Sequence, residues 1–162
     1  MNPRDKIVGS LDQLDFFCEA IRSSANSEKI VLTSGCFDLL HGGHLQYICE
    51  AGKMGYLVVG INSDIFVKKL KGSTRPIRTQ EDRAFLMAGF YHVRLVTIFN
   101  CDYELIRAVR PDIYVASLTS NVRIWSDKKR VGLLNTFGTE IIELGGFKRD
   151  STTAIIKRAV IT

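Results

Sequence analysis

The hydrophobic positions along the chain follow two alternating patterns. Short apolar runs rich in β-branched residues predict five strands, at residues 29–34, 56–62, 93–99, 112–117 and 139–145. Apolar residues at helical spacing predict helices over 11–25, over 44–54, from a Thr79 cap to about Tyr91, from an Asp102 cap to Pro111, over 121–136, and onward from a Ser151 cap. This alternation predicts an α/β chain, a Rossmann-like three-layer α/β/α fold with a five-stranded, mostly parallel sheet.

Length and composition predict one domain. The 162 residues are 46% apolar and 24% charged, so we expect a single globular domain over 1–162, with 1–28 as an N-terminal helical extension. No stretch approaches the ~20 apolar residues of a membrane span, and the first ten residues lack the apolar core of a signal peptide. The four cysteines form no Cys-x-x-Cys pair, which favours free thiols and a cytoplasmic protein with no membrane partner.

The basic residues narrow the choice of ligand. The net charge is +5, and its densest stretch is Lys68, Lys69, Lys71, Arg75 and Arg78. No aromatic residue lies within this stretch, whereas single-stranded nucleic-acid sites usually combine basic and aromatic side chains. The segment therefore favours a mobile loop that binds phosphate, and we expect no nucleic-acid partner.

The first long strand leads into Gly35-Cys36-Phe37-Asp38-Leu39-Leu40-His41-Gly42-Gly43-His44. Its glycines let a ligand approach the backbone, and a helix opening at His44 would present free N–H groups to an anion. Both imidazoles could donate hydrogen bonds to phosphoryl oxygens as charge builds in a transition state. Two alternatives stay open: the histidines are turn and cap residues, or they bind zinc with Cys36 and Cys49, although that spacing is unusual for zinc.

This run closely resembles the His-x-Gly-His signature of the cytidylyltransferase-like nucleotidyltransferase superfamily. Five further segments have counterparts in the same order: INSD (61–64), KKLKGSTRPI (68–77), EDRAFLMAG (81–89), IRAVRPDIYV (106–115) and STTAIIKR (151–158). The LKGxxRPI segment resembles the adenylyltransferase of the ADP-heptose pathway, a unit often fused to a sugar kinase. Glycerol-3-phosphate cytidylyltransferases, which lack that segment, are a more distant match.

The resemblance implies that a phosphate monoester attacks the α-phosphorus of a nucleoside triphosphate and that pyrophosphate leaves. Such a transfer needs positioning and charge neutralisation more than covalent chemistry. It further implies ATP rather than CTP, a sugar phosphate like heptose 1-phosphate as acceptor, Mg²⁺ on the triphosphate, and a homodimer.

The resemblance also assigns roles to particular residues. The catalytic positions are His41, His44 and Lys68. The nucleotide-binding positions are Cys36, Phe37, Lys71, Arg83, Ser151 and Thr152. The substrate-binding positions are Asp38 and Arg75. Which of Lys68 and Lys71 acts on the phosphates is left open, and no residue is assigned to a protein-bound metal.

Two segments depart from the heptose-type pattern. Residues 116–120 read Ala-Ser-Leu-Thr-Ser where that branch carries a Lys-Gly-Gly-Asp-Tyr-like loop, and Arg149 stands where a glycine is common. These changes spare the transfer residues and alter the recognition residues. The alternatives are therefore a cytidylyltransferase that uses CTP and a polyol or other phosphate, a nucleotide-binding protein without turnover, and, from charge alone, a nucleic-acid-binding module.

Overall fold

A computed structural model describes residues 2–118, 124–145 and 152–159. Within them lies a parallel sheet of six strands in the order β1-β4-β3-β2-β5-β6. The strands are β1 (Ile7–Val8), β2 (Ile30–Gly35), β3 (Tyr56–Asn62), β4 (Val93–Phe99), β5 (Ile113–Ser117) and β6 (Glu140–Leu144). The α/β class and the parallel sheet are confirmed. The strand count was one short, because β1 has two residues and lies in the segment predicted to be a helical extension.

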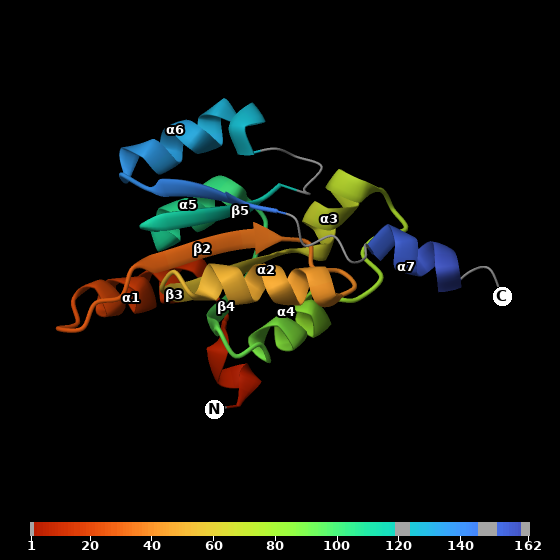
Figure 1. The fold of residues 1–162 in the computed structure, drawn as a ribbon, viewed down its shortest axis with the longest axis horizontal. Helices are drawn as coiled ribbons and strands as arrows, with labels where there is room; N and C mark the ends of the chain where they lie inside the picture. The colour runs from red at the N-terminus through yellow and green to blue at the C-terminus, as the bar shows by residue number, and fades with distance from the viewer. Residues whose placement is uncertain (1, 119–123, 146–151, 160–162) are drawn as a thin grey trace.

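Helices cover both faces of the sheet (Figure 1). The helices are α1 (Leu11–Arg22), α2 (Gly42–Gly52), α3 (Asp64–Lys71), α4 (Gln80–Ala88), α5 (Asp102–Val109), α6 (Lys128–Thr136) and α7 (Thr152–Ala159), with 3-10 turns at Pro3–Lys6 and Ile124–Ser126. One face packs against α2 and α4, and the other packs against α1, α5 and α6. None of the helices in the described ranges is long and apolar enough to cross a membrane.

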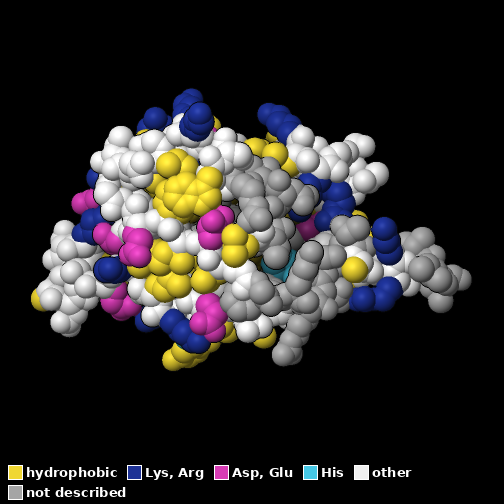
Figure 2. Space-filling model, turned by 45° about the horizontal axis from the view of Figure 1, so that its top comes forward, with side chains coloured by type: hydrophobic (Ala, Val, Ile, Leu, Met, Phe, Trp, Pro, Cys, Tyr) yellow, Lys and Arg dark blue, Asp and Glu magenta, His cyan; other side chains and the backbone are white. Residues whose placement is uncertain are grey.

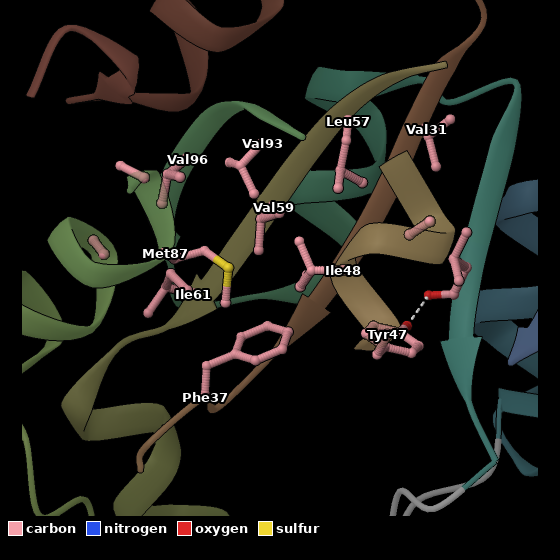
Figure 3. Close-up of a cluster of buried hydrophobic side chains, with 14 of the residues drawn as sticks. Val31, Phe37, Tyr47, Ile48, Leu57, Val59, Ile61, Met87, Val93 and Val96 are labelled. Atoms are coloured by element: carbon pink, nitrogen blue, oxygen red, sulfur yellow. Dashed lines mark hydrogen bonds between the residues drawn. The ribbon is translucent and has the colours of Figure 1, made fainter. Parts of the chain in front are cut away.

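The two cores follow from the alternation of side chains along each strand. In β3, Val59 and Ile61 point into the α2/α4 core with Ile48 and Met87 (Figure 3). Val58 points into the opposite core. A strand buried on both faces needs a continuous apolar run, which explains why residues 56–62 carry no alternating polar positions.

The sheet is weakly joined where its strand order reverses. β2 pairs with β3 over six residues but with β5 only at Val31–Ile113 and Leu32–Tyr114. Beyond that point the Tyr47 hydroxyl lies 2.7 Å from Thr33 Oγ1 and donates to the Val115 carbonyl over 2.9 Å (Figure 3). The carboxyl ends of β2 and β5 are therefore not paired with each other. Ligands of open parallel sheets bind at such a switch point.

The predicted basic loop is partly a helix, which corrects the sequence interpretation. The Ser63 side chain caps α3 by accepting from the Phe66 N–H over 3.1 Å, and Gly72 ends it at a φ of 94°. Val67 is buried beneath it. Lys68, Lys69 and Lys71 thus lie on a rigid element at the carboxyl edge of the sheet rather than on a mobile loop.

The helix starts and the state of the cysteines can also be compared with the predictions from the sequence. Thr79 caps α4 as predicted, with the Asp82 N–H 3.2 Å from its hydroxyl. Two predicted starts were wrong: α2 begins at Gly42 with His41 as its cap, and α5 begins at Asp102 itself. The predicted Ser151 cap lies outside the described residues. All four cysteines are free thiols, as expected.

We predict that Gly55→Ala destabilises the fold. Gly55 has a φ of 153°, and an added Cβ would lie 2.2 Å from the Lys29 carbonyl oxygen. Because backbone must move, we expect a loss of at least about 2 kcal/mol in the free energy of unfolding, measured by urea denaturation. The matched control is Gly132→Ala in α6, where nothing lies within 4 Å and up to about 1 kcal/mol should be gained. Equal effects of the two substitutions would contradict this account.

Candidate active site

The turn after β2 is anchored by Phe37. Its backbone adopts a positive φ of 46°, and its side chain is buried beside Ile48 and Met87 (Figure 3). The ring also meets the His44 imidazole edge-to-face, with 5.5 Å between centroids. The Phe37 side chain therefore forms the floor beneath His44. That the backbone around Cys36 and Phe37 faces a nucleotide stays a prediction.

The two histidines stack on each other at the start of α2. Their ring centroids are 3.8 Å apart and their planes differ by 28°. His41 Nδ1 accepts from the Gly43 N–H over 3.2 Å, so the proton of a neutral His41 ring is on Nε2. Figure 2 shows a histidine side chain at the bottom of a hollow, with basic and acidic side chains beside it.

The first amides of α2 are largely used within the helix. Besides the Gly43 amide, the His44 and Leu45 amides donate to the His41 carbonyl, over 2.9 and 3.2 Å. The expectation of free N–H groups from His44 onward is corrected by this cap. An anion at this turn would therefore meet the imidazole side chains more than the backbone.

Burial and neighbouring cations keep His44 neutral. Desolvation, followed by the influence of His41 and Lys71, lowers the pKa of His44 from 6.5 to about 4. Its Nδ1 is buried and has no hydrogen-bond partner in the described part of the chain. A bound anion would raise this pKa, because a nearby negative charge favours the imidazolium.

Lys71 is close enough to the site to influence its titratable groups. Its charge lowers the pKa of His44 and opposes the burial that raises the pKa of the Cys36 thiol. Lys68 lies one turn earlier, and both lysines are exposed. Which of them contacts a phosphate stays open. Burial disfavours the thiolate form of Cys36.

Asp38 holds the segment before α4 and is shielded from solvent. Its side chain accepts from the amides of Ile77 and Arg78 over 2.8 and 3.1 Å, and it pairs with the Arg75 guanidinium at 2.7 Å. The Asp38 residue is only 2% exposed. The two side chains bind each other and fix the loop. That Asp38 and Arg75 bind substrate stays a prediction.

Arg83 is also buried, and it joins three segments of the site. Its guanidinium donates to the carbonyls of Cys36 (2.6 Å) and Asn62 (2.8 Å). It also donates to the Arg78 carbonyl (3.1 Å) and pairs with Asp64 at 2.7 Å. With no exposed surface, Arg83 positions the backbone around the site, and its predicted role in nucleotide binding stays a prediction.

The start of α7 reaches the same turn. Thr152 Oγ1 donates to the Leu39 carbonyl over 3.3 Å, which brings this predicted nucleotide-binding residue beside the histidine turn. Ser151 and Arg149 lie outside the described residues, as do Thr119 and Ser120 of the departing loop.

A second polar cluster lies at this edge and was not predicted from the sequence. Its members are Ser34, Asp102, Tyr114 and Arg130. The available signal was Asp102, which lies three residues after the third predicted strand (93–99) and which we interpreted as a helix cap. Within the described ranges, no three His, Cys, Asp or Glu side chains are placed to hold a metal ion.

Comparison with known proteins defines the class. The cytidylyltransferase-like family matches residues 32–158, and the chain belongs to it. The fold is thus that of a cytidylyltransferase-like protein, as the sequence indicated. Among curated relatives, the bifunctional protein HldE of Nitratiruptor sp. is 37% identical over 96% of this chain and 32% of its own length. That of Helicobacter pylori is 43% identical over 82% of this chain and 28% of its own.

The chain spans about a third of the length of the curated relatives that it matches. Among solved structures, a lipopolysaccharide core biosynthesis protein of Thermoplasma volcanium aligns with a TM-score of 0.62 and 24% identity, over 76% of this chain and 99% of the other. A pantoate-beta-alanine ligase of Francisella tularensis aligns with a TM-score of 0.55 and 15% identity, over 96% of this chain and 77% of the other. Both show the shared fold.

We predict that Arg83→Met destabilises the fold, because it leaves three carbonyls and the Asp64 carboxylate without their donor. The expected loss is about 3 kcal/mol or more in the free energy of unfolding. Arg107→Met, at an exposed position of α5, is the control and should change stability by less than about 0.5 kcal/mol. Similar losses for both variants, measured by urea denaturation, would show that Arg83 is not a structural link.

We predict a pH dependence of stability that comes from His44. Its folded pKa of about 4 lies below the unfolded value of 6.5, so the unfolded chain binds the proton more readily between these values. The contribution is complete above about pH 6.5 and is lost as the pH falls toward 4, by about 2–3 kcal/mol. Urea denaturation across this interval should show a shallower decline for His44→Gln. Identical slopes for the variant and the wild type would contradict the prediction.

Proposed function

We propose that the chain transfers AMP from ATP to a sugar phosphate of the heptose 1-phosphate type, with release of pyrophosphate. The observation that carries this proposal is the stacked His41–His44 pair beside Lys71 at the switch point of the sheet. Support also comes from the bifunctional HldE relatives, which share this domain.

The chemistry asks for positioning and neutralisation of charge. An acceptor phosphate oxygen attacks the α-phosphorus, the bond to the bridging oxygen breaks, and the electron pair leaves with pyrophosphate. His44 would donate a hydrogen bond to an α-phosphate oxygen, and Lys71 would neutralise charge beside it. The negative charge of the triphosphate raises the pKa of His44, which makes it a better donor once the nucleotide is bound. Mg²⁺ would arrive as part of the triphosphate complex.

The turn and its supports would keep this geometry fixed. Arg83 and Asp38 hold the backbone on either side of Phe37, and Phe37 supports the His44 ring. Fixed donors cost no reorganisation when charge develops. Catalysis by this site would therefore depend on side chains that never touch the substrate.

We predict that His44→Ala lowers kcat/KM for pyrophosphate release by about 100-fold or more, because one donor to the transferring phosphate is lost. The assay contains Mg²⁺ and heptose 1-phosphate, with ATP and CTP run in parallel. The matched control is His92→Ala, since His92 packs against Gly52 at the opposite edge of the sheet. Unchanged turnover in His44→Ala would refute the mechanism.

A second candidate is a nucleotide-binding protein without turnover. Ala116, Ser117 and Leu118 favour it, because they replace the Lys-Gly-Gly pattern of the heptose-type loop. Release of pyrophosphate with ATP would exclude this candidate, whereas release with CTP alone would favour the cytidylyltransferase. Silence with both nucleotides, together with ATP binding in a calorimetric titration, would support it.

A further inference from the structure

The second polar cluster lies on the sheet face opposite the histidines. Successive side chains of a strand point to opposite faces, so Ser34 faces α5 whereas Thr33 faces α2 and Tyr47. Ser34 Oγ lies 3.2 Å from the Tyr114 hydroxyl and donates to Asp102 over 3.4 Å. The cluster therefore borders the unpaired carboxyl ends of β2 and β5, directly before the turn that carries His41 and His44.

Arg130 of α6 completes the cluster. Its guanidinium pairs with Asp102 at 2.9 Å and with Asp127 at 3.3 Å, and it faces the Tyr114 hydroxyl. The side chains of Arg130 and Asp102 are 16% and 12% exposed, so both are largely shielded from solvent but not fully buried. Arg130 Nε is buried without a hydrogen-bond partner in the described part of the chain.

Stability alone explains this arrangement poorly. Taking charges out of water costs several kcal/mol per ion by order of magnitude, and the attraction between them offsets this only when every donor is satisfied. Here a donor of Arg130 is left over, and burial raises the pKa of the Asp102 carboxyl even though Arg130 opposes it. A polar network with spare hydrogen-bonding capacity at a switch point is a feature of a binding site.

The histidine side and the cluster side of the sheet carry different charges, which favours different parts of a ligand. The histidine site has Lys71 near His44, whereas the cluster combines Arg130 with Asp102 and Asp127, and Lys129 lies farther out over the Tyr103 ring. A phosphate would be attracted by Lys71 on the histidine face. On the cluster face it would be repelled by the carboxylates of Asp102 and Asp127. Neutral hydroxyl groups, which both donate and accept, fit a carboxylate beside a guanidinium and two hydroxyls.

Building on the transferase function proposed above, we propose that Ser34, Asp102 and Arg130 bind hydroxyl groups of the phosphorylated acceptor. The acceptor would then lie across the gap between β2 and β5, with its phosphate toward His44 and its sugar toward α5 and α6. In this arrangement the cluster determines which phosphate ester is used, and the histidine face performs the transfer.

Asp102→Asn and Ser34→Ala test this assignment. We expect Asp102→Asn to raise the KM for heptose 1-phosphate about tenfold or more, and Ser34→Ala to raise it about threefold, with the KM for ATP unchanged. Calorimetry should show weaker binding of heptose 1-phosphate to both variants and unchanged binding of inorganic phosphate. The matched control, Lys53→Met, removes an ion pair with Glu50 at the far edge and should alter neither constant. Thermal unfolding verifies that each variant is folded.

The outcomes separate the two proposals. An unchanged KM for the acceptor, or equal rises for acceptor and ATP in folded variants, would overturn the hydroxyl site and leave the transferase intact. Wild-type protein that binds heptose 1-phosphate no more tightly than inorganic phosphate would also overturn it. Tight binding that depends on Ser34 and Asp102, without pyrophosphate release, would support the hydroxyl site and contradict the transferase function.

Discussion

The buried guanidinium of Arg83 is the interaction on which the carboxyl edge of the sheet depends. It gathers carbonyls from the turn after β2, from the end of β3 and from the residue before the α4 cap. Asp38 adds a second link between the same turn and the segment before α4. Because a lysine has no planar fork of donors, it could not join three segments in this way. The position of His44 is therefore fixed by the buried charged side chains of Arg83 and Asp38.

The switch point organises chemistry on both sides of one strand. Thr33 and Ser34 are adjacent in β2, yet their side chains belong to different polar groups because the strand alternates. Tyr47 connects β2 to β5 where the ladder between them ends. The short ladder is thus compatible with a stable sheet, and it leaves the strand ends separate enough to border two distinct groups of side chains.

The fold was predictable where a buried strand leaves a nearly continuous run of apolar residues in the sequence. The bounds of β3 and β4 agree with the prediction, because both strands are mostly apolar and buried along their length. α3 was missed because Lys68, Lys69 and Lys71 obscured the boundaries that Ser63 and Gly72 mark. The histidine turn was found from its motif. The roles of Asp38 and Arg83 were not, since their partners lie 39 and 47 residues away and only the folded chain brings them together.

The depressed pKa of His44 has a consequence for ligand affinity. An anion that raises this pKa from about 4 draws a proton onto the ring, so binding and proton uptake are thermodynamically linked. In weakly acidic solution the affinity for a phosphate ester should rise as the pH falls. The heat of binding should then vary with the ionisation enthalpy of the buffer, because the buffer supplies the proton. Binding of a nucleotide at the imidazole pair would thus include the uptake of a proton.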